Sequence, residues 1–303
     1  MYLNPGVFRI RNIEKIVQRT ENFIEEAMTR LHRDGIVIGI SGGLDSSVTA
    51  ALAARAVGAD KVTGLMLHDR EETPEAKNYA ETIAKHLDIH VNRFDISPIL
   101  SKLQVYRFFS KFFPSRKKSR PILLDMFKSI DENPFIEFHK GMQNHAIRKG
   151  ISLINCKHRV RLIYAYQFAE EHNLLVVGAA QKTEDLLGLY TKFGIDDCAD
   201  IMPLRRFYRT QVLHIGQYLN LPEKILTRPS NPDILPELKN KYKDILGFNV
   251  NTLDLILYGL KNNMKHSEMA KQLSIEENYI KKIAELVDIT EHMRKHSMPP
   301  SLL

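Results

Sequence analysis

Short apolar runs alternate with stretches of helical spacing along the N-terminal part of the chain. The runs have strand length and predict buried strands at residues 36–38, 61–67, 89–94 and 174–178. Apolar residues three and four apart predict helices at residues 8–33, 48–57, 74–87 and 159–172. Strands that alternate with helices form a parallel sheet by right-handed crossovers, and the helices cover both of its faces. The pattern therefore predicts an α/β fold built on a doubly wound parallel sheet.

The C-terminal part of the chain shows helical patterns. They predict helices at residues 213–219, 253–261, 267–273 and 275–287. We expect the last helix to begin at Ser274, because Glu277 follows three residues later and completes a capping box. Residues 1–303 are therefore expected to form one domain, with a sheet followed by a helical C-terminal part.

The alternation of strands and helices stops between residues 97 and 150, and we place an insert at about residues 101–150. Its segment 102–120 holds seven Lys or Arg and no Asp or Glu, with aromatic residues among them. Such a segment can grip a phosphate backbone, or it can be an amphipathic helix with solvated charges. Because it follows the third strand, whose carboxyl end lies at the edge where ligands bind, we expect a lid or partner surface and no nucleic-acid binding.

Composition narrows the setting of the protein. A length of 303 residues with 44% apolar content is enough for a full core. No run approaches the ~20 apolar residues of a membrane span, and the start lacks the features of a signal peptide, so we expect a cytoplasmic protein. The two cysteines, Cys156 and Cys198, form no C-x-x-C motif and suit reduced thiols. A net charge of +7 favours polyanionic partners such as nucleotides.

The segment 39–47, G-I-S-G-G-L-D-S-S, joins the first predicted strand to the helix that follows it. A helix that starts directly after a buried strand presents free N–H groups and a positive dipole end to an anion. The glycines allow close approach, Ser41 and Ser46 can donate to phosphate oxygens, and Asp45 can hold a divalent cation. No Lys follows the glycines, so this is not a P-loop of the G-x-x-x-x-G-K-[ST] kind. We expect the loop to bind the phosphates of a nucleotide.

Four blocks of the sequence resemble one known family. The loop resembles the S-G-G-x-D-S signature of the N-type ATP pyrophosphatases. Residues 178–200, G-A-A-Q-K-T-E-D-L-L-G-L-Y-T-K-F-G-I-D-D-C-A-D, resemble the G-T-[DN]-x-x-E-x-x-x-G-x-x-T-K-[FY]-G-D-G-x-x-D block of the ammonia-dependent NAD synthetases. Residues 155–162, N-C-K-H-R-V-R-L, are similar to their N-x-K-A-R-x-R-M block, and residues 290–300 to their closing T-E-H-K-R…P-P. The resemblance implies an adenine nucleotide α-hydrolase-like, Rossmann-like fold.

The same resemblance implies an ATP-dependent amide ligase and a set of site residues. ATP would adenylate the nicotinate carboxylate of deamido-NAD, and ammonia would then displace AMP to give NAD. The implied catalytic residues are Asp45, Glu184 and Lys192, and the implied Mg²⁺ ligands are Asp45 and Glu184. The implied ATP-binding residues are Gly39, Ile40, Ser41, Gly42, Gly43, Leu44, Asp45, Ser46, Ala179, Arg209 and Ser230. The residues implied for deamido-NAD are Arg159, Lys192, Asp200 and His292. Members of the family are homodimers, which implies a homodimer here.

The chain departs from the family pattern near the implied site. Ala179 and Ala180 replace a Thr and an Asn or Asp, and Arg209 replaces a Lys. The block 178–200 is one residue longer than the pattern, and residues 236–244, P-E-L-K-N-K-Y-K-D, stand where the family carries an acidic run. These changes remove polar groups and add positive charge. A different carboxylate substrate, amidated by the same chemistry, is therefore the alternative.

Two other classes of protein stay open from the residues alone. A tRNA-modifying enzyme with the same loop would adenylate a base and hold RNA with the basic segment, although no C-x-x-C pair is present to carry sulfur. A binder that keeps only the fold is the other class, and intact Asp45 and Glu184 argue against it. No Cys lies near the N-terminus to serve a glutaminase domain, so ammonia would be free or supplied by a separate protein.

Overall fold

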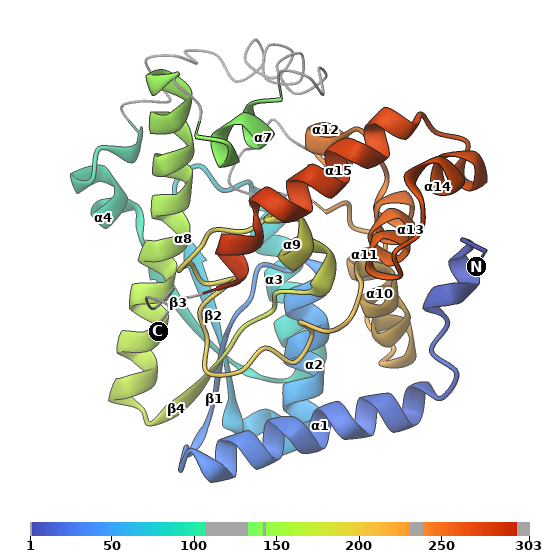
Figure 1. Ribbon diagram of the computed structural model, residues 1–303. Helices are drawn as coiled ribbons and strands as arrows, with labels where there is room; N and C mark the ends of the chain where they lie inside the picture. The colour runs from blue at the N-terminus through green and yellow to red at the C-terminus, as the bar shows by residue number, and fades with distance from the viewer. Residues whose placement is uncertain (1, 107–132, 142–143, 231–238, 296–303) are drawn as a thin grey trace, which may run out of the picture.

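The computed structural model describes residues 2–106, 133–141, 144–230 and 239–295. Its centre is a four-stranded parallel sheet in the order β3-β2-β1-β4 (Figure 1). The strands are β1 (Gly35–Gly39), β2 (Val62–His68), β3 (His90–Asp95) and β4 (Leu174–Val177). Ile38 of the central strand β1 pairs with Gly64 of β2 and with Val177 of β4. The predicted strands and the predicted α/β class are confirmed.

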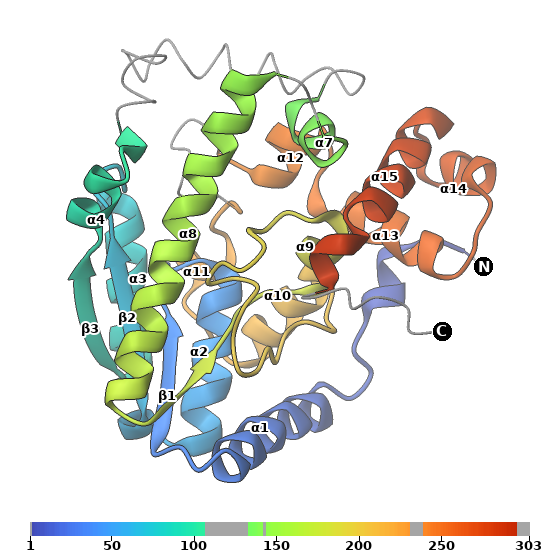
Figure 2. The same ribbon diagram turned by 60° about the vertical axis from the view of Figure 1, so that its left-hand side comes forward.

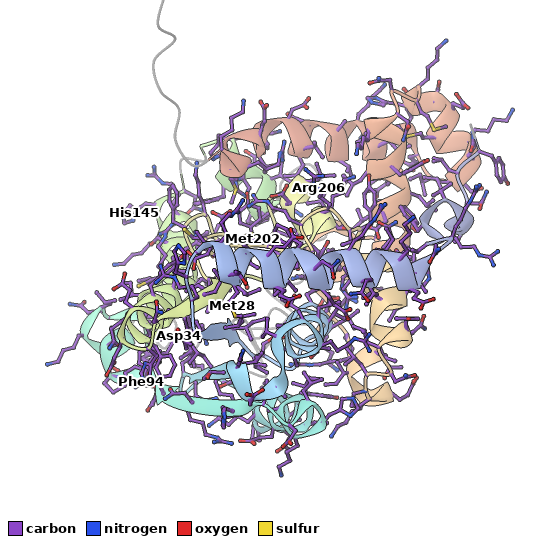
Figure 3. All side chains as sticks on the ribbon, turned by 90° about the horizontal axis from the view of Figure 1, so that it is seen from below. Met28, Asp34, Phe94, His145, Met202 and Arg206 are labelled. Carbon is purple, nitrogen blue, oxygen red and sulfur yellow. The ribbon has the colours of Figure 1, made fainter. Side chains whose placement is uncertain are left out.

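Helices cover both faces of this sheet (Figures 1 and 2). One face carries α1 (Ile13–Arg30), α2 (Leu44–Val57), the short η2 (Ala59–Lys61), α3 (Pro74–Leu87) and α10 (Arg209–Tyr218). The other face carries α4 (Ser97–Lys102) and α8 (His145–Glu171). Ile36 and Ile38 of β1 pack into the core on the first face, and Val37 between them packs on the second, because side chains alternate along a strand. In the view from below, α1 lies across the molecule and Met28 packs against the first core (Figure 3).

The helical C-terminal part has a core of its own. It contains α9 (Lys182–Leu187), α12 (Lys241–Leu246), α13 (Val250–Lys261), α14 (His266–Leu273), α15 (Glu277–Ile289) and η3 (Glu291–Arg294), whereas α11 (Glu223–Leu226) packs against α2, α3 and α10. Leu253, Ile256 and Ile283 are buried there, together with Phe8 of the N-terminal η1 (Pro5–Phe8). The first residues of the chain thus pack against the last helices, while the chain between them forms the sheet (Figure 1).

Several predicted helix boundaries are wrong. α8 begins at His145, well before the predicted start at 159, and α10 begins at Arg209 where 213 was expected. Ser274 does not open the last helix: it ends α14 in the left-handed conformation with φ 54°, and α15 begins at Glu277. The first turn of α10, Arg209 to Gln211, is polar and carries no apolar periodicity, and Ser suits several kinds of helix end. The first turns of α8 do carry apolar residues at helical spacing, at positions 147, 151 and 154, but this stretch was assigned to the insert.

The predicted insert lies partly outside the described residues. Its described portions belong to the end of α4, to α7 (Pro134–His139) and to the first turns of α8. The basic segment after residue 106 is not described, so its role as a lid stays a prediction. Among the described helices, none combines the length and apolar character needed to cross a bilayer.

Candidate functional site

The glycine loop forms a short turn between β1 and α2. Gly43 is the N-cap of α2 and has no side-chain cap, so the first N–H groups of the helix face outward. The loop is held from inside by its serines: Ser47 Oγ donates to Gly43 O at 2.7 Å and Ser46 Oγ donates to the same oxygen at 3.1 Å. Small, buried residues along α2 let this helix lie close to the sheet. The result is a short turn at the positive end of a fourteen-residue helix, an arrangement that suits an anion.

Gly42 has a separate role in this loop. Its φ of +70° lies in the left-handed region, and a Cβ there would lie 2.5 Å from the backbone N of Ala80. Gly42 therefore lets α3 pack directly against the loop. It does not line the cavity in front of the loop.

A cavity of about 340 Å³ opens in front of the loop. It lies among the carboxyl ends of β1, β2 and β4, the middle of α8, and the first turns of α9, α10 and α12. Most of the residues implied for ATP line it: Gly39, Ile40, Ser41, Gly43, Leu44, Asp45, Ser46, Ala179, Arg209 and Ser230. Glu184 lines it as well. Ligands of open parallel sheets bind at this edge because the loops after the strands converge there.

Asp45 and Glu184 both line the cavity, Asp45 acts electrostatically on Glu184, and each has a cation beside it. Arg209 Nε lies 3.4 Å from Asp45 Oδ1, and Lys241 Nζ forms an ion pair with Glu184 Oε1. Burial raises the pKa of Glu184 above its usual range, with Lys241 opposing the shift and Asp45 adding to it. Burial alone would lower the pKa of Lys241, but Glu184 and Asp45 outweigh it and raise this pKa, so the ammonium stays charged.

A buried network behind the cavity sets the positions of Glu184 and Arg209. Asp254 of α13 is fully buried and accepts hydrogen bonds from Thr183 Oγ1, Thr210 Oγ1 and the backbone N–H of Thr210. Thr183 Oγ1 in turn accepts from the backbone N–H of Arg209 at 3.0 Å. One carboxylate thus joins the first turns of α9 and α10, which are the helices that carry the two site residues.

The sequence reasoning missed several charged residues of the cavity, among them Lys241, Asp196 and His158. His158 Nδ1 lies 2.9 Å from Asp196 Oδ2. Burial would raise the pKa of Asp196, but His158 and Lys241 outweigh it and hold this pKa below its usual range. A signal existed, because Lys241 stands in the basic stretch that replaces an acidic run and Asp196 stands in the lengthened block 178–200. The sequence does not show where these side chains point, because no local pattern indicates that they turn toward Glu184.

The four residues implied for deamido-NAD do not line the cavity. Lys192 Nζ donates to His292 O at 2.6 Å and to Lys295 O at 2.7 Å, and Arg159 donates to Lys192 O. Asp200 Oδ2 accepts from the backbone N–H of Val176 at 2.8 Å and so ties the chain to the end of β4. In this structure Lys192 fastens the C-terminal segment instead of facing Asp45 and Glu184.

Comparison with known proteins identifies the family. A sequence model of NAD synthase matches residues 16–113 and 122–297. The chain belongs to the NAD synthase family. The NH(3)-dependent NAD(+) synthetase of Thermotoga maritima is 32% identical over 279 residues, which cover 90% of this chain and 95% of the relative. The enzyme of the same description from Coprothermobacter proteolyticus is 35% identical over 263 residues, covering 84% and 88%. The solved structure of NMN synthetase from Francisella tularensis superposes with a TM-score of 0.71 at 21% identity, covering 96% and 99%, and so shares the fold.

The site of this NAD synthase family member has the donor chemistry for Mg²⁺. Carboxylate oxygens are the ligands this ion prefers, and Asp45 Oδ1 is a buried oxygen without a hydrogen-bond donor among the described residues. Within the described part of the chain no group of three or more His, Cys, Asp or Glu is arranged to hold a metal by itself. Asp45 and Glu184 therefore fit a metal that takes its other ligands from phosphate and water, as Mg²⁺ commonly does.

Proposed function

We propose that this cavity is where the chain, an ammonia-dependent NAD synthetase, activates deamido-NAD and converts it to NAD. In the first step a carboxylate oxygen of deamido-NAD attacks the α-phosphorus of ATP, the bond to the β-phosphate oxygen breaks, and pyrophosphate leaves. In the second step the nitrogen of ammonia attacks the acyl carbon, the bond to AMP breaks, and a proton is released. The observation that carries the proposal is the meeting of the uncapped N-terminus of α2 with Asp45, Glu184 and Arg209 in one cavity.

Each part of the wall suits a part of this reaction. The uncapped N–H groups at the start of α2 would bind the pyrophosphate, whose charge grows as the α–β bond breaks. Arg209, held by Asp45 and by Ser230 Oγ at 3.4 Å, offers a second cation to the phosphates. Two anions must meet in the first step, so positive groups on both sides of the reacting phosphorus lower the barrier. Bound Mg²⁺ would supply part of this charge compensation from the oxygens of Asp45 and Glu184.

Ammonia supply and assembly belong to the same proposal. The relatives that match this chain are described as NH(3)-dependent, which supports ammonia from solution or from a separate protein as the nitrogen source. The apolar stripe of α1 is used inside the subunit, since Val17, Ile24 and Ala27 are buried against the sheet. Phe23 of the same helix is 43% exposed and Ile163 of α8 is 70% exposed, so both helices still offer apolar side chains to a homodimer. We place the enzyme in the cytoplasm, where its nucleotide substrates are found.

The test is to incubate the purified protein with ATP, Mg²⁺, ammonium and one carboxylate at a time. Deamido-NAD should give NAD, AMP and pyrophosphate in equal amounts, and nicotinate mononucleotide serves as the competing substrate. Production of ADP and phosphate, or faster turnover of another carboxylate, would contradict the proposal. Asp45→Ala and Glu184→Ala should each lower kcat/KM by about 100-fold or more, because each removes a group that stabilises charge in the transition state. Glu25→Ala, an exposed carboxylate on α1, is the matched control and should leave activity unchanged.

A further inference from the structure

One ammonium group lies at the centre of the acidic side chains of the cavity. Lys241 Nζ is ion-paired with Glu184 Oε1, and the carboxylates of Asp45 and Asp196 also act on it electrostatically. The side chains of Lys241 and Glu184 are 19% and 7% exposed, so the pair is largely withdrawn from water. A cation position in this cavity is thus occupied by a residue of the chain itself.

The backbone of Lys241 is held in place, whereas its ammonium group can move by rotation about the side-chain bonds. Its backbone N–H donates to Ser230 O at 2.9 Å, and it is the first residue of α12. The next residue, Tyr242, is fully buried, and its hydroxyl accepts from Gln181 Nε2 at 2.8 Å. Gln181 also caps α9 by accepting from the N–H of Glu184. The segments that carry the two residues of the ion pair are therefore joined by the hydrogen bond between Gln181 and Tyr242, and the four-carbon stem of Lys241 can redirect the ammonium.

The charges decide which cation can occupy the position. Two cations cannot share the Glu184 oxygens at ligand distance without strong repulsion, so free Mg²⁺ has to displace the ammonium from a mostly buried ion pair. Without phosphates, the displaced ammonium would keep only Asp196, which already lies 2.9 Å from His158 Nδ1, so the displacement is costly. A metal–nucleotide complex changes this balance, because its phosphates offer the displaced ammonium new oxygens a short distance away in the same cavity.

We propose that Lys241 holds the metal position of the nucleotide-free enzyme and passes from Glu184 to the phosphates when metal and nucleotide enter together. The inference rests on the proposed function of the cavity. Its consequence is an ordered site: the free metal is excluded, and the metal is admitted with ATP. The same ammonium then contacts the phosphates while pyrophosphate forms.

The first test measures binding of Mn²⁺ alone, in place of Mg²⁺, by the loss of the free-ion EPR signal. The full chain is used without nucleotide. Lys241→Met removes the competing ammonium and should bind Mn²⁺ about tenfold or more tightly than the wild type, since an occupied site lowers apparent affinity by the occupied fraction. Lys241→Arg keeps a cation on Glu184 and should stay near the wild type. Lys243→Met, two residues along and exposed, removes the same charge outside the cavity and should change nothing.

The second test measures ATP binding in EDTA by calorimetry, where no metal assists. Lys241→Met should weaken metal-free ATP about tenfold, as expected for loss of one charge-assisted contact to phosphate. Unchanged Mn²⁺ affinity in Lys241→Met, or an equal rise in Lys243→Met, would overturn the proposal, as would unchanged ATP affinity in EDTA. If Lys241→Met does not fold, as judged by its thermal unfolding, Lys241→Gln takes its place with the same expected results. Neither measurement needs turnover, so this inference can fail while the NAD synthetase activity of the wild type stands, and the reverse.

Discussion

Replacing Asp254 tests the hydrogen-bond network that supports the site, without removing a residue that lines the cavity. It touches no part of the cavity, yet it is fully buried and accepts from Thr183 Oγ1 at 2.5 Å, Thr210 Oγ1 at 2.6 Å and Thr210 N at 2.9 Å. A hydrogen bond to a charged acceptor contributes about 1.5–3 kcal/mol, and a buried donor left without an acceptor costs about 1–3 kcal/mol. The two hydroxyls can rotate toward other acceptors, whereas the N–H of Thr210 cannot. We therefore expect Asp254→Ala to lower the free energy of unfolding by about 3–5 kcal/mol.

Urea unfolding followed by circular dichroism measures this loss, and steady-state kinetics on the same variant measures its effect on the site. Because α9 and α10 carry Glu184 and Arg209, we expect KM for ATP to rise as their first turns separate. Asn251→Ala is the matched control: it removes only a 3.3 Å contact to Thr210 Oγ1 at an exposed position and should cost less than about 1 kcal/mol. A loss below about 1 kcal/mol in Asp254→Ala would refute the reasoning, since the network would then not hold the two helices together.

Two further predictions concern stability. Burial, together with the positive charge of His292, lowers the pKa of His139 from 6.5 to about 4, so its imidazole is neutral in the folded protein at neutral pH. Between pH 6.5 and pH 4 the unfolded chain therefore binds one proton more than the folded protein. The free energy of unfolding should fall by about 2 kcal/mol as the pH drops from 6.5 to 4. His139→Leu should reduce this dependence on pH, which urea titrations at several pH values measure. Gly42→Ala should cost about 2–4 kcal/mol and weaken ATP binding, because its Cβ would meet the backbone N of Ala80 at 2.5 Å. Gly247→Ala has a similar φ of +78° with open space around it, so its loss should be only about 1 kcal/mol, and equal losses in the two variants would show that the contact with α3 is unimportant.

Local patterns in the sequence were enough to predict the sheet and the phosphate loop. Strands such as β1 are buried on both faces and therefore read as continuous apolar runs, and residues 39–47 lie where one such run meets a helix. The placement of Asp45 at the loop and of Glu184 after β4 followed from strand order, because the carboxyl ends of parallel strands share one edge. These features depend on residues that are neighbours in the chain, and their physical causes are burial and backbone geometry.

Only the tertiary structure decided which charges meet. Lys241 is 57 residues from Glu184, and the hydrogen bond between the side chains of Tyr242 and Gln181 joins the two segments that carry them. Lys192 belongs to a motif that implies a catalytic role. Its ammonium instead donates to the carbonyl oxygens of His292 and Lys295, about 100 residues further along the chain. A periodicity records which face of an element is buried, but it holds no information on where a long, flexible side chain finds its partner. The sequence thus determined the fold and the position of the site, and the packing of distant elements determined the electrostatics within it.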